Sequence, residues 1–241
     1  MGKADLHIHT RVSDGMASIE QVLAYVEHQT DLDVIAVTDH EDVTGGLRAR
    51  DLAAKRGYRF EVVPGVEVTT LHGHVLGLWV EENPRSFRRV ESTLEMIHAQ
   101  GGVAAVPHPM SWLTRSVSSR TLDRLWRRGE PGIGFDAIET GNPSPAGRVT
   151  RARAASANTE RWGLAALGGS DAHHLPHVGT GWTEFEGTTG EELRVAILAG
   201  ATSVGTGRYP SSKEIGRTQV AAGLAWGYLA TPRKMLRGRR Q

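Results

Sequence analysis

Residues 4–9 read Ala-Asp-Leu-His-Ile-His, an alternation of apolar and polar side chains that predicts a β-strand. In a strand, His7 and His9 turn to the same face, so both imidazoles can reach one metal ion. The alternative is two histidines on a solvent-facing strand surface. We interpret the segment as an early strand of an α/β fold that ends in a metal-binding His-x-His pair.

Beyond this strand, short apolar runs alternate with longer segments of helical period, as in βα units with a parallel sheet. Strands are predicted at residues 4–8, 33–37, 59–63 continuing toward 68, 74–79, 103–106, 135–139, 164–167 and 202–204. Helices are predicted at residues 19–28, 46–55, 87–100, 148–161 and 190–198. Ser18 and Thr189 are predicted N-caps, and Gly57, Gly101 and Gly163 predicted C-terminal caps. The fold class is therefore α/β.

Polar motifs follow the predicted strands where the strands end, which is where α/β folds concentrate their sites. They are Ser13-Asp14-Gly15, Thr38-Asp39-His40, Gly65-Val66-Glu67, Pro107-His108-Pro109 and Gly169-Ser170-Asp171-Ala172-His173, with His74 at the start of a further strand. Such a recurrence at strand ends is stronger evidence for a metal site than any single motif.

The composition narrows the chemistry. A chain of 241 residues with 39% hydrophobic content can bury the core of one catalytic domain, residues 1–241. A net charge of +1 argues against a surface dedicated to nucleic-acid backbone or anionic lipid. The absence of cysteine leaves His, Asp and Glu as the strong metal ligands. The N-terminus lacks a signal peptide pattern and no apolar run spans a membrane, so we expect a cytoplasmic protein.

Two segments stand apart from the βα pattern. Residues 110–134 are longer than a connecting helix needs and are predicted to form a cap over one end of the sheet, although packing would also explain them. Residues 231–241 form a basic tail that would touch a membrane surface, RNA or a partner, or would simply be a solvated terminus. Its basic residues are Arg233, Lys234, Arg237, Arg239 and Arg240.

In order, the motifs DLHIHT (5–10), SDG (13–15), TDH (38–40), PGVE (64–67), HVLG (74–77), HP (108–109) and GSDAH (169–173) resemble those of the polymerase and histidinol phosphatase (PHP) family. This resemblance implies a distorted (β/α)7 TIM-like barrel with metal-dependent phosphoesterase activity. The Asp of the SDG motif, Asp14, is similar to the residue at this place in the trinuclear members of the family. Those members act on small phosphoesters, nucleotides or oligonucleotide ends. Histidinol phosphatases of the family often carry His at this place, so that activity is disfavoured.

The resemblance also implies a set of metal ligands. One ion would be held by His7, His9, Glu67 and Asp171, a second by Glu67, His74 and His108, and a third by Asp14, His40 and His173. Glu67 would bridge the first two, and Glu67, Asp171 and His173 are also expected to act in catalysis. Mixed imidazole and carboxylate ligands suit two or three ions of Mn, Fe or Zn better than Mg or Ca.

Charge explains why the substrate would be a phosphate ester. Three divalent ions carry about +6 against about −3 from three ligand carboxylates, which leaves a positive pocket. A hydroxide shared by two ions would attack phosphorus. Arg148, Arg151 and Arg115 are candidates for binding the phosphate oxygens. With 24 Arg against 4 Lys in the chain, ordinary helix-surface arginines are a comparable interpretation.

Other polar residues near the motifs are expected to play supporting parts. Asp5 and Asp39 would orient an imidazole. His174 and His177 could protonate a leaving group, but surface histidines are the commoner case. His72 is an alternative to His74, and His28 and His98 are expected to be structural.

Two other classes of function compete. An amidohydrolase-like hydrolase commonly bridges its ions with a carbamylated lysine, but Lys3, Lys55, Lys213 and Lys234 are not at such a strand end. A non-catalytic metal- or phosphate-binding module would be expected to lose ligands, whereas all nine positions are filled. We therefore expect hydrolysis of a small phosphate ester, nucleotide or oligonucleotide end. Monoesterase and diesterase action both stay open, and no obligatory protein partner is evident.

Overall fold

The computed structural model describes residues 1–223 and 225–227, so the predicted basic tail at 231–241 lies outside the described residues. The strands form one sheet in the order β7-β6-β5-β4-β3-β2-β1-β8-β9. Their bounds are β1 Gly2–Ile8, β2 Val34–Val37, β3 Glu61–Thr70, β4 Gly73–Leu78, β5 Val103–Val106, β6 Ala137–Gly141, β7 Ala165–Gly168, β8 Gly181–Phe185 and β9 Ser203–Thr206. Among these nine strands, seven run in one direction, and β4 and β8 run antiparallel to their neighbours.

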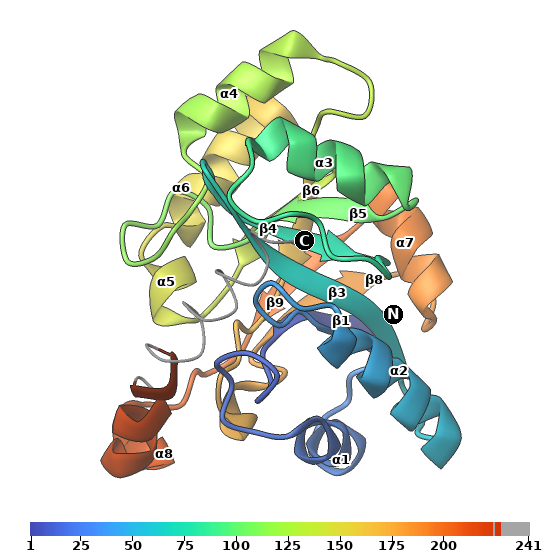
Figure 1. Cartoon of the computed structure of the whole chain (residues 1–241), viewed down its shortest axis with the longest axis vertical. Helices are drawn as coiled ribbons and strands as arrows, with labels where there is room; N and C mark the ends of the chain where they lie inside the picture. The colour runs from blue at the N-terminus through green and yellow to red at the C-terminus, as the bar shows by residue number, and fades with distance from the viewer. Residues whose placement is uncertain (224, 228–241) are drawn as a thin grey trace.

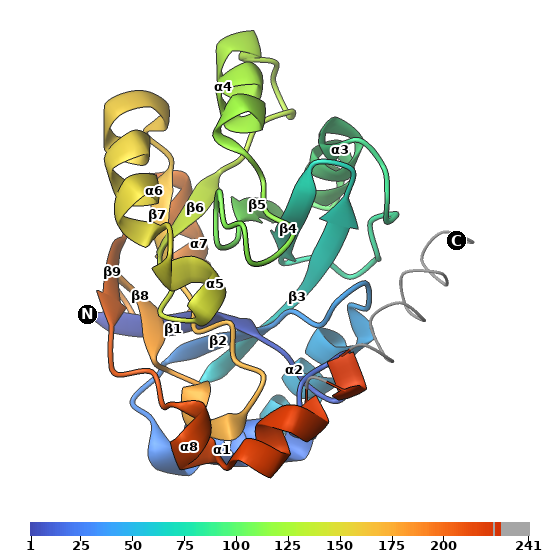
Figure 2. The ribbon, with the colours of Figure 1, turned by 90° about the vertical axis from the view of Figure 1, so that its left-hand side faces the viewer.

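The sheet curls until its two ends nearly meet (Figure 2). On β8, the Thr183 hydroxyl both accepts from the Gly168 N–H of β7 at 2.9 Å and donates to the Gly168 carbonyl at 3.0 Å. Thr202, just before β9, donates its hydroxyl to the Ala166 carbonyl of β7 at 2.7 Å. A side chain at Gly168 would collide with the Trp182 backbone, so glycine permits this close approach. The predicted distorted (β/α)7 barrel is confirmed, and β4 and β8 are part of its distortion.

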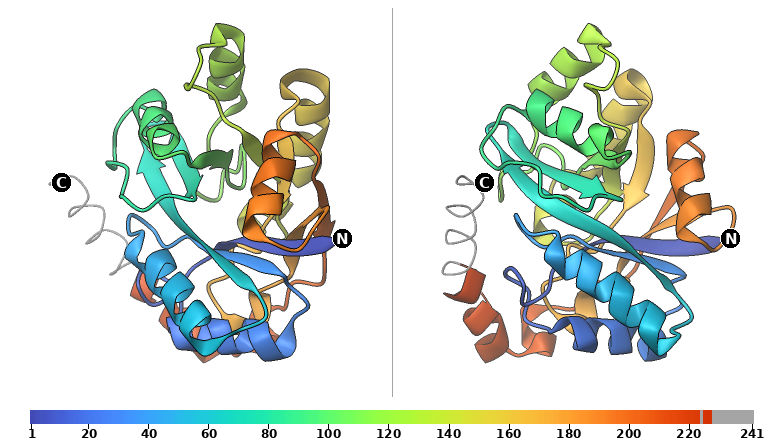
Figure 3. Two further views of the ribbon diagram at one scale, coloured as in Figure 1. Left: turned by 90° about the vertical axis from the view of Figure 1, so that its right-hand side faces the viewer. Right: turned by 45° about the vertical axis from the view of Figure 1, so that its right-hand side comes forward.

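Helices surround this curled sheet, and most of them cover its outside (Figures 1 and 3). They are α1 Ile19–Gln29, α2 Thr44–Arg56, α3 Val90–Ala99, α4 Ser119–Arg128, α5 Pro145–Arg148, α6 Arg151–Ala157, a π-helical turn at Asn158–Trp162, a 3-10 turn at Leu175–His177, α7 Gly190–Leu198 and α8 Ser212–Ile215. Ser18 and Thr189 cap α1 and α7 in capping boxes, as predicted. Gly57 and Gly163 adopt the predicted left-handed C-cap conformation, and Gly101 is left-handed one residue after the C-cap Gln100.

Two predicted helices differ from the structure because of long-range contacts, and one strand was not predicted. The single helix predicted at 148–161 is wrong, because Thr150 leaves helical geometry and donates its hydroxyl to the Pro109 carbonyl at 2.8 Å, which separates α5 from α6. The helix predicted from residue 87 begins at Val90, since the Phe87 N–H bonds to the Thr69 carbonyl of β3. Strand β8 was not predicted, because its sequence, Gly-Trp-Thr-Glu-Phe, contains no continuous apolar run.

The segment predicted as a cap divides into two parts. Residues 110–118 form a loop that follows β5, and α4 packs Leu122 and Leu125 into the buried cluster beneath α3. Only the loop therefore lies at the strand ends. Among the described residues, none of the helices combines the length and apolar character that a membrane crossing requires.

His98 on α3 is held in a structural contact, as its helical position predicted. Its Nδ1 lies 2.8 Å from the Gly132 carbonyl and its Nε2 lies 2.9 Å from Asp136 Oδ2. The hydrogen bond to Asp136 raises the pKa of His98. The charged imidazole is thus favoured by folding, and its contribution is present below the unfolded pKa of about 6.5 and fades as pH rises through the folded pKa.

We predict that His98→Ala lowers the free energy of unfolding by about 1 kcal/mol at pH 5.5 and by less at pH 8.5. Urea unfolding at the two pH values measures both differences. Asp136→Asn, which retains an acceptor for the Ala104 N–H, should remove most of the pH dependence. An equal loss at both pH values in His98→Ala would contradict the assigned contact.

Candidate metal centre

The nine predicted ligands come from six strands or their ends and meet at one rim of the barrel. His7 lies in β1, Glu67 in β3 and His74 in β4, whereas the others directly or closely follow β1, β2, β5 and β7. Those others are His9, Asp14, His40, His108, Asp171 and His173. Because β4 is antiparallel to β3, its first residues reach the rim where the parallel strands end. Backbone bridges Ile8–Ala172 and His40–Glu67 fix the rim.

Glu67 lies at the centre of this arrangement, with 1% of its side chain exposed. Its Oε1 lies 2.8 Å from His74 Nδ1 and 3.1 Å from His108 Nε2. Its Oε2 lies 3.2 Å from His7 Nε2, 3.3 Å from His9 Nε2 and 3.5 Å from His40 Nδ1. One carboxylate thus faces five imidazoles, which is the geometry that a bridging ligand requires.

The ligand atoms fall into four overlapping groups, and within each group all atoms lie within 4.8 Å of one another. The groups are His9-Asp14-His40-His173, His7-His9-Asp171, His7-Glu67-His108 and His40-Glu67-His74. They combine the residues of the three predicted ion positions, but His7, His9 and His40 each belong to two groups. The distances alone therefore do not assign each ligand to one ion, and that assignment stays a prediction.

The buried nitrogens of this cluster fit a metal better than a hydrogen-bond network. Both ring nitrogens of His9 are buried and lack hydrogen-bond geometry to any described residue. His9 Nδ1 lies 3.6 Å from Asp14 Oδ1, and His9 Nε2 lies 3.3 Å from Glu67 Oε2 and 3.5 Å from Asp171 Oδ1. Donors bonded to one ion at about 2.1 Å stand roughly 3.0 to 3.4 Å apart in tetrahedral or octahedral geometry. The donor set therefore fits divalent cations.

The pKa values of the buried side chains are shifted by the charges that face them. Burial alone would raise the pKa of Glu67, but His40, His74 and His7 hold it well below its ordinary value. Burial would lower the pKa of His9, but the carboxylates of Asp171 and Glu67 raise it to about 10. The buried carboxylates thus stay ionised and need positive charge beside them. Bound metal ions would supply that charge and leave the buried imidazoles neutral.

Glu139 is a buried carboxylate in contact with two candidate ligands, and the sequence analysis did not single it out. Its Oε1 lies 2.8 Å from His7 Nδ1, and its Oε2 accepts hydrogen bonds from the His108 N–H at 2.6 Å and the Asn142 amide at 2.8 Å. The carboxylate therefore fixes the His7 ring with Nε2 toward Glu67. Its position just before Asn142 at the end of a predicted strand was the available signal.

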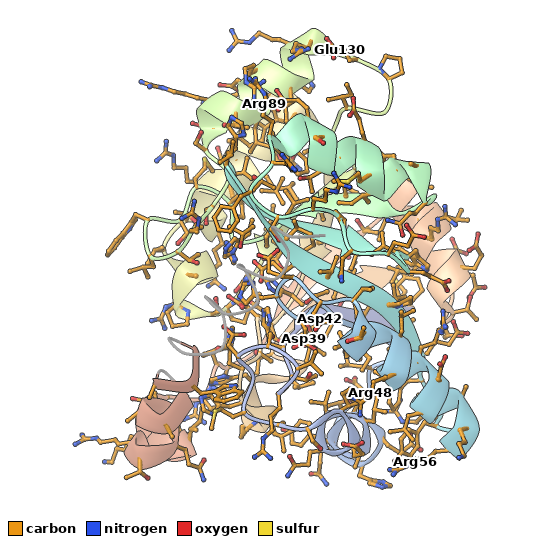
Figure 4. The ribbon with its side chains drawn as sticks, viewed as in Figure 1. Asp39, Asp42, Arg48, Arg56, Arg89 and Glu130 are labelled. Carbon is orange, nitrogen blue, oxygen red and sulfur yellow. The ribbon has the colours of Figure 1, made fainter. Side chains whose placement is uncertain are left out.

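Asp5 and Asp39 hold the backbone of the rim. Asp39 accepts the Thr10 N–H at 2.7 Å and both the N–H and the hydroxyl of Ser13, which shapes the turn that carries Asp14 (Figure 4). Asp5 accepts the N–H groups of His7, Ser170 and Gly179. The prediction that these carboxylates orient an imidazole is wrong, since their hydrogen bonds go to the chain segments that bear the ligands.

The other histidines near the motifs, His72, His174 and His177, belong to none of the four ligand groups. His72 accepts the Val90 N–H at the β3–β4 turn, so His74 is the histidine that reaches Glu67. His177 stacks on Tyr209 at 3.8 Å, and burial lowers its pKa to about 4. A neutral His177 in this position is a poor proton donor, and the suggestion that it protonates a leaving group has no support in the geometry.

The ligands open into a pocket whose other walls the sequence analysis missed. Besides the ligands Asp14, His40, Glu67, His74, His108, Asp171 and His173, it is lined by Leu113, Thr114, Ser144, Pro145, Ala146 and Tyr209. None of these lining residues is Arg or Lys. Arg148 and Arg115 are exposed outside this lining, and Arg151 donates to the Thr206 hydroxyl at 3.3 Å. The structure thus does not bring the three predicted arginines to the ligands.

Two ligands have unusual backbone conformations. His108 and Asp171 have φ angles of 30° and 53°, in the region that favours glycine. Such conformations in non-glycine residues cost roughly 1 to 3 kcal/mol and cluster at functional sites. The hydrogen bond from the His108 N–H to Glu139 and that from the Ser144 hydroxyl to Asp171 Oδ2 help to hold them.

Comparisons with known proteins agree with this geometry. A family model described as PHP-associated matches residues 151–202. The chain is 34% identical to the uncharacterised protein MJ1587 of Methanocaldococcus jannaschii over 132 residues, which cover 50% of this chain and 75% of that protein.

A second relative is the phosphoribosyl 1,2-cyclic phosphate 1,2-diphosphodiesterase of Eggerthella lenta, 38% identical over 102 residues, 39% of this chain and 38% of that protein. In fold, the chain is similar to a two-domain protein of Bacteroides vulgatus that contains a predicted PHP-like metal-dependent phosphoesterase. The TM-score is 0.64 at 18% identity, covering 85% of this chain and 64% of that one.

We predict that Glu139→Gln weakens metal retention about 10- to 100-fold, because an amide N–H would face the His7 or the His108 donor. Metal content after dialysis against a chelator measures the change. Glu130→Gln is the matched control, since Glu130 lies on the loop after α4 and bonds to Arg128 (Figure 4). Equal metal content in the two variants would contradict the role given to Glu139.

Proposed function

This chain belongs to the PHP family of metal-dependent phosphoesterases, and on that premise we propose that it hydrolyses the phosphate ester of a small molecule, a nucleotide or an oligonucleotide end. Two or three divalent ions of Mn, Fe or Zn would be its cofactors. The observation that carries the proposal is the convergence of nine candidate ligand side chains around Glu67, seven of which line one pocket.

The two competing functions fit this site less well. A lysine-bridged amidohydrolase centre would need a lysine at the position that Glu67 occupies, and none lines the pocket of the described structure. A binding module without activity would not need all nine candidate ligands to be retained, with seven of them on the wall of an open pocket. Hydrolysis is the use of the site that accounts for both features.

The residues of the chain divide the work. Bound divalent cations would neutralise the phosphoryl oxygens and make water a stronger nucleophile. Glu67 and Asp171 are buried carboxylates that would bind the cations at the base of the pocket. His173, with 34% of its side chain exposed, is the ligand imidazole most open to the pocket. Burial raises the pKa of the Tyr209 hydroxyl above its ordinary value, so it stays protonated and can donate a hydrogen bond to substrate.

Among the described residues, neither Arg nor Lys lines the pocket, which bears on how the substrate phosphate would be bound. Without a guanidinium beside the ligands, the charge of the scissile phosphate would be met by the cations themselves. Arg148, Arg151 and Arg115 would then act only on parts of a substrate that extend beyond the pocket. The phosphate-binding role proposed for the three arginines is therefore limited to further phosphates of a larger substrate.

Asp14→Ala and His108→Ala are each expected to lower kcat/KM at least about 100-fold while the fold is retained, because each removes a ligand from a different side of the cluster. Steady-state rates on a panel of phosphoesters measure the loss, and circular dichroism checks the fold. Asp51→Ala on the exposed side of α2 and His28→Ala on α1 are matched controls. Wild-type rates in either ligand variant would overturn the proposed site.

Removal of metal provides a separate test. Treatment with a strong chelator should abolish phosphoester hydrolysis, and addition of Mn, Fe or Zn should restore it, because water alone is too weak a nucleophile at neutral pH. The measurement is turnover against metal equivalents added to the stripped protein. Full activity in protein shown to be metal-free would exclude the mechanism.

A further inference from the structure

The loop at residues 110–118 is tied directly to two metal ligands. The Ser116 hydroxyl lies 2.9 Å from His108 Nδ1 and donates to the His108 carbonyl at 2.8 Å. The Arg115 carbonyl accepts the His74 N–H at 3.0 Å. Gly73 has a φ of 128°, and a side chain there would collide with the backbone of Ser116 and Val117. The loop is therefore seated closely on β4, next to the ligands.

Trp112 stands on this loop with 77% of its surface exposed. The following residues, Leu113 and Thr114, line the pocket. The Ser111 N–H bonds to the His108 carbonyl and the Leu113 N–H bonds to the Ser111 hydroxyl, so the chain on both sides of the indole is anchored. Within the described part of the chain, the indole makes neither a ring contact nor a hydrogen bond.

The pocket walls beyond the ligands mix apolar and hydroxyl-bearing side chains. They are Leu113, Pro145 and Ala146, and Thr114, Ser144 and Tyr209. A flat aromatic ring needs apolar surface and a π-face to stack on. Leu113 in the lining offers apolar surface, and the exposed indole of Trp112, the preceding residue on the same loop, offers the π-face.

We propose that Trp112 is a specificity-determining residue that stacks against a nucleobase or similar flat aromatic ring of the substrate while the phosphate lies at the metal ligands. This inference rests on the proposed phosphoesterase function and adds to it the class of organic group. The scissile phosphate would be recognised by charge at the ligand cluster, and the ring by stacking at the loop.

The test uses two esters that share the same phosphate linkage, AMP and ribose 5-phosphate, with metal-reconstituted protein. We expect kcat/KM for AMP to exceed that for ribose 5-phosphate about 10-fold, and Trp112→Ala to remove this preference mainly through KM. Trp112→Phe should retain most of it. Trp126→Ala is the matched control, because Trp126 is 56% exposed but lies on α4, away from the pocket.

A second readout does not require turnover. AMP should quench the tryptophan fluorescence of the wild type and of Trp126→Phe, but not that of Trp112→Phe, and ribose 5-phosphate should quench none. Unchanged quenching in Trp112→Phe would overturn the proposal. An equal loss of kcat/KM for both esters in Trp112→Ala would also overturn it, because it would show that the indole only supports the loop.

The two proposals fail in different ways. Wild-type protein that hydrolyses ribose 5-phosphate as well as AMP would refute stacking and leave the phosphoesterase function intact. Protein that hydrolyses no phosphoester with any of the metals would refute the proposed function, and fluorescence quenching would still decide whether Trp112 contacts the base.

Discussion

A buried carboxylate surrounded by imidazoles is the constraint on which the rest of the structure depends. Glu67 is almost fully buried and faces His7, His9, His40, His74 and His108. An ionised carboxylate at such a place is strongly destabilised unless positive charge lies beside it. The nearly closed barrel provides that charge by bringing strand ends that are distant in sequence to one rim. The curvature of the sheet is therefore needed to place the imidazoles around the Glu67 carboxylate.

A layer of further carboxylates supports this centre. Glu139 holds the His7 ring and the His108 backbone, and Asp39 and Asp5 hold the turns after β1 and β7. Glu139 accepts the His108 N–H, and Asp5 accepts the N–H of Ser170, next to Asp171, so these bonds help to hold the left-handed backbone conformations of His108 and Asp171. The layer also places several ionisable carboxyl groups in the interior of a protein whose net charge is only +1.

The sequence predicted those features that local patterns encode. The strand with His7 and His9, the caps Ser18 and Thr189, and the polar motifs at strand ends all depend on spacing within a few residues. Features set by distant contacts were missed. Nothing near Glu139 shows that it meets His7, Tyr209 enters the pocket wall from far along the chain, and Thr150 interrupts a helix because Pro109 lies beside it. The positions of Arg148 and Arg151 relative to the pocket were not predictable either, since helical periodicity does not tell which face of a helix meets the rim.

The pairing of β1 with the segment after β7 has a consequence for biosynthesis. The His9 N–H bonds to the Ala172 carbonyl, and the Ala172 N–H bonds to the His7 carbonyl, so the first and last ligand segments lock each other. During translation, which adds about 5 to 20 residues per second, His7 and His9 leave the ribosome well before Asp171 exists. A nascent chain therefore cannot hold the complete cation cluster. A complete centre would therefore be assembled only after the barrel has closed, when the ions available to the finished apoprotein would compete for it.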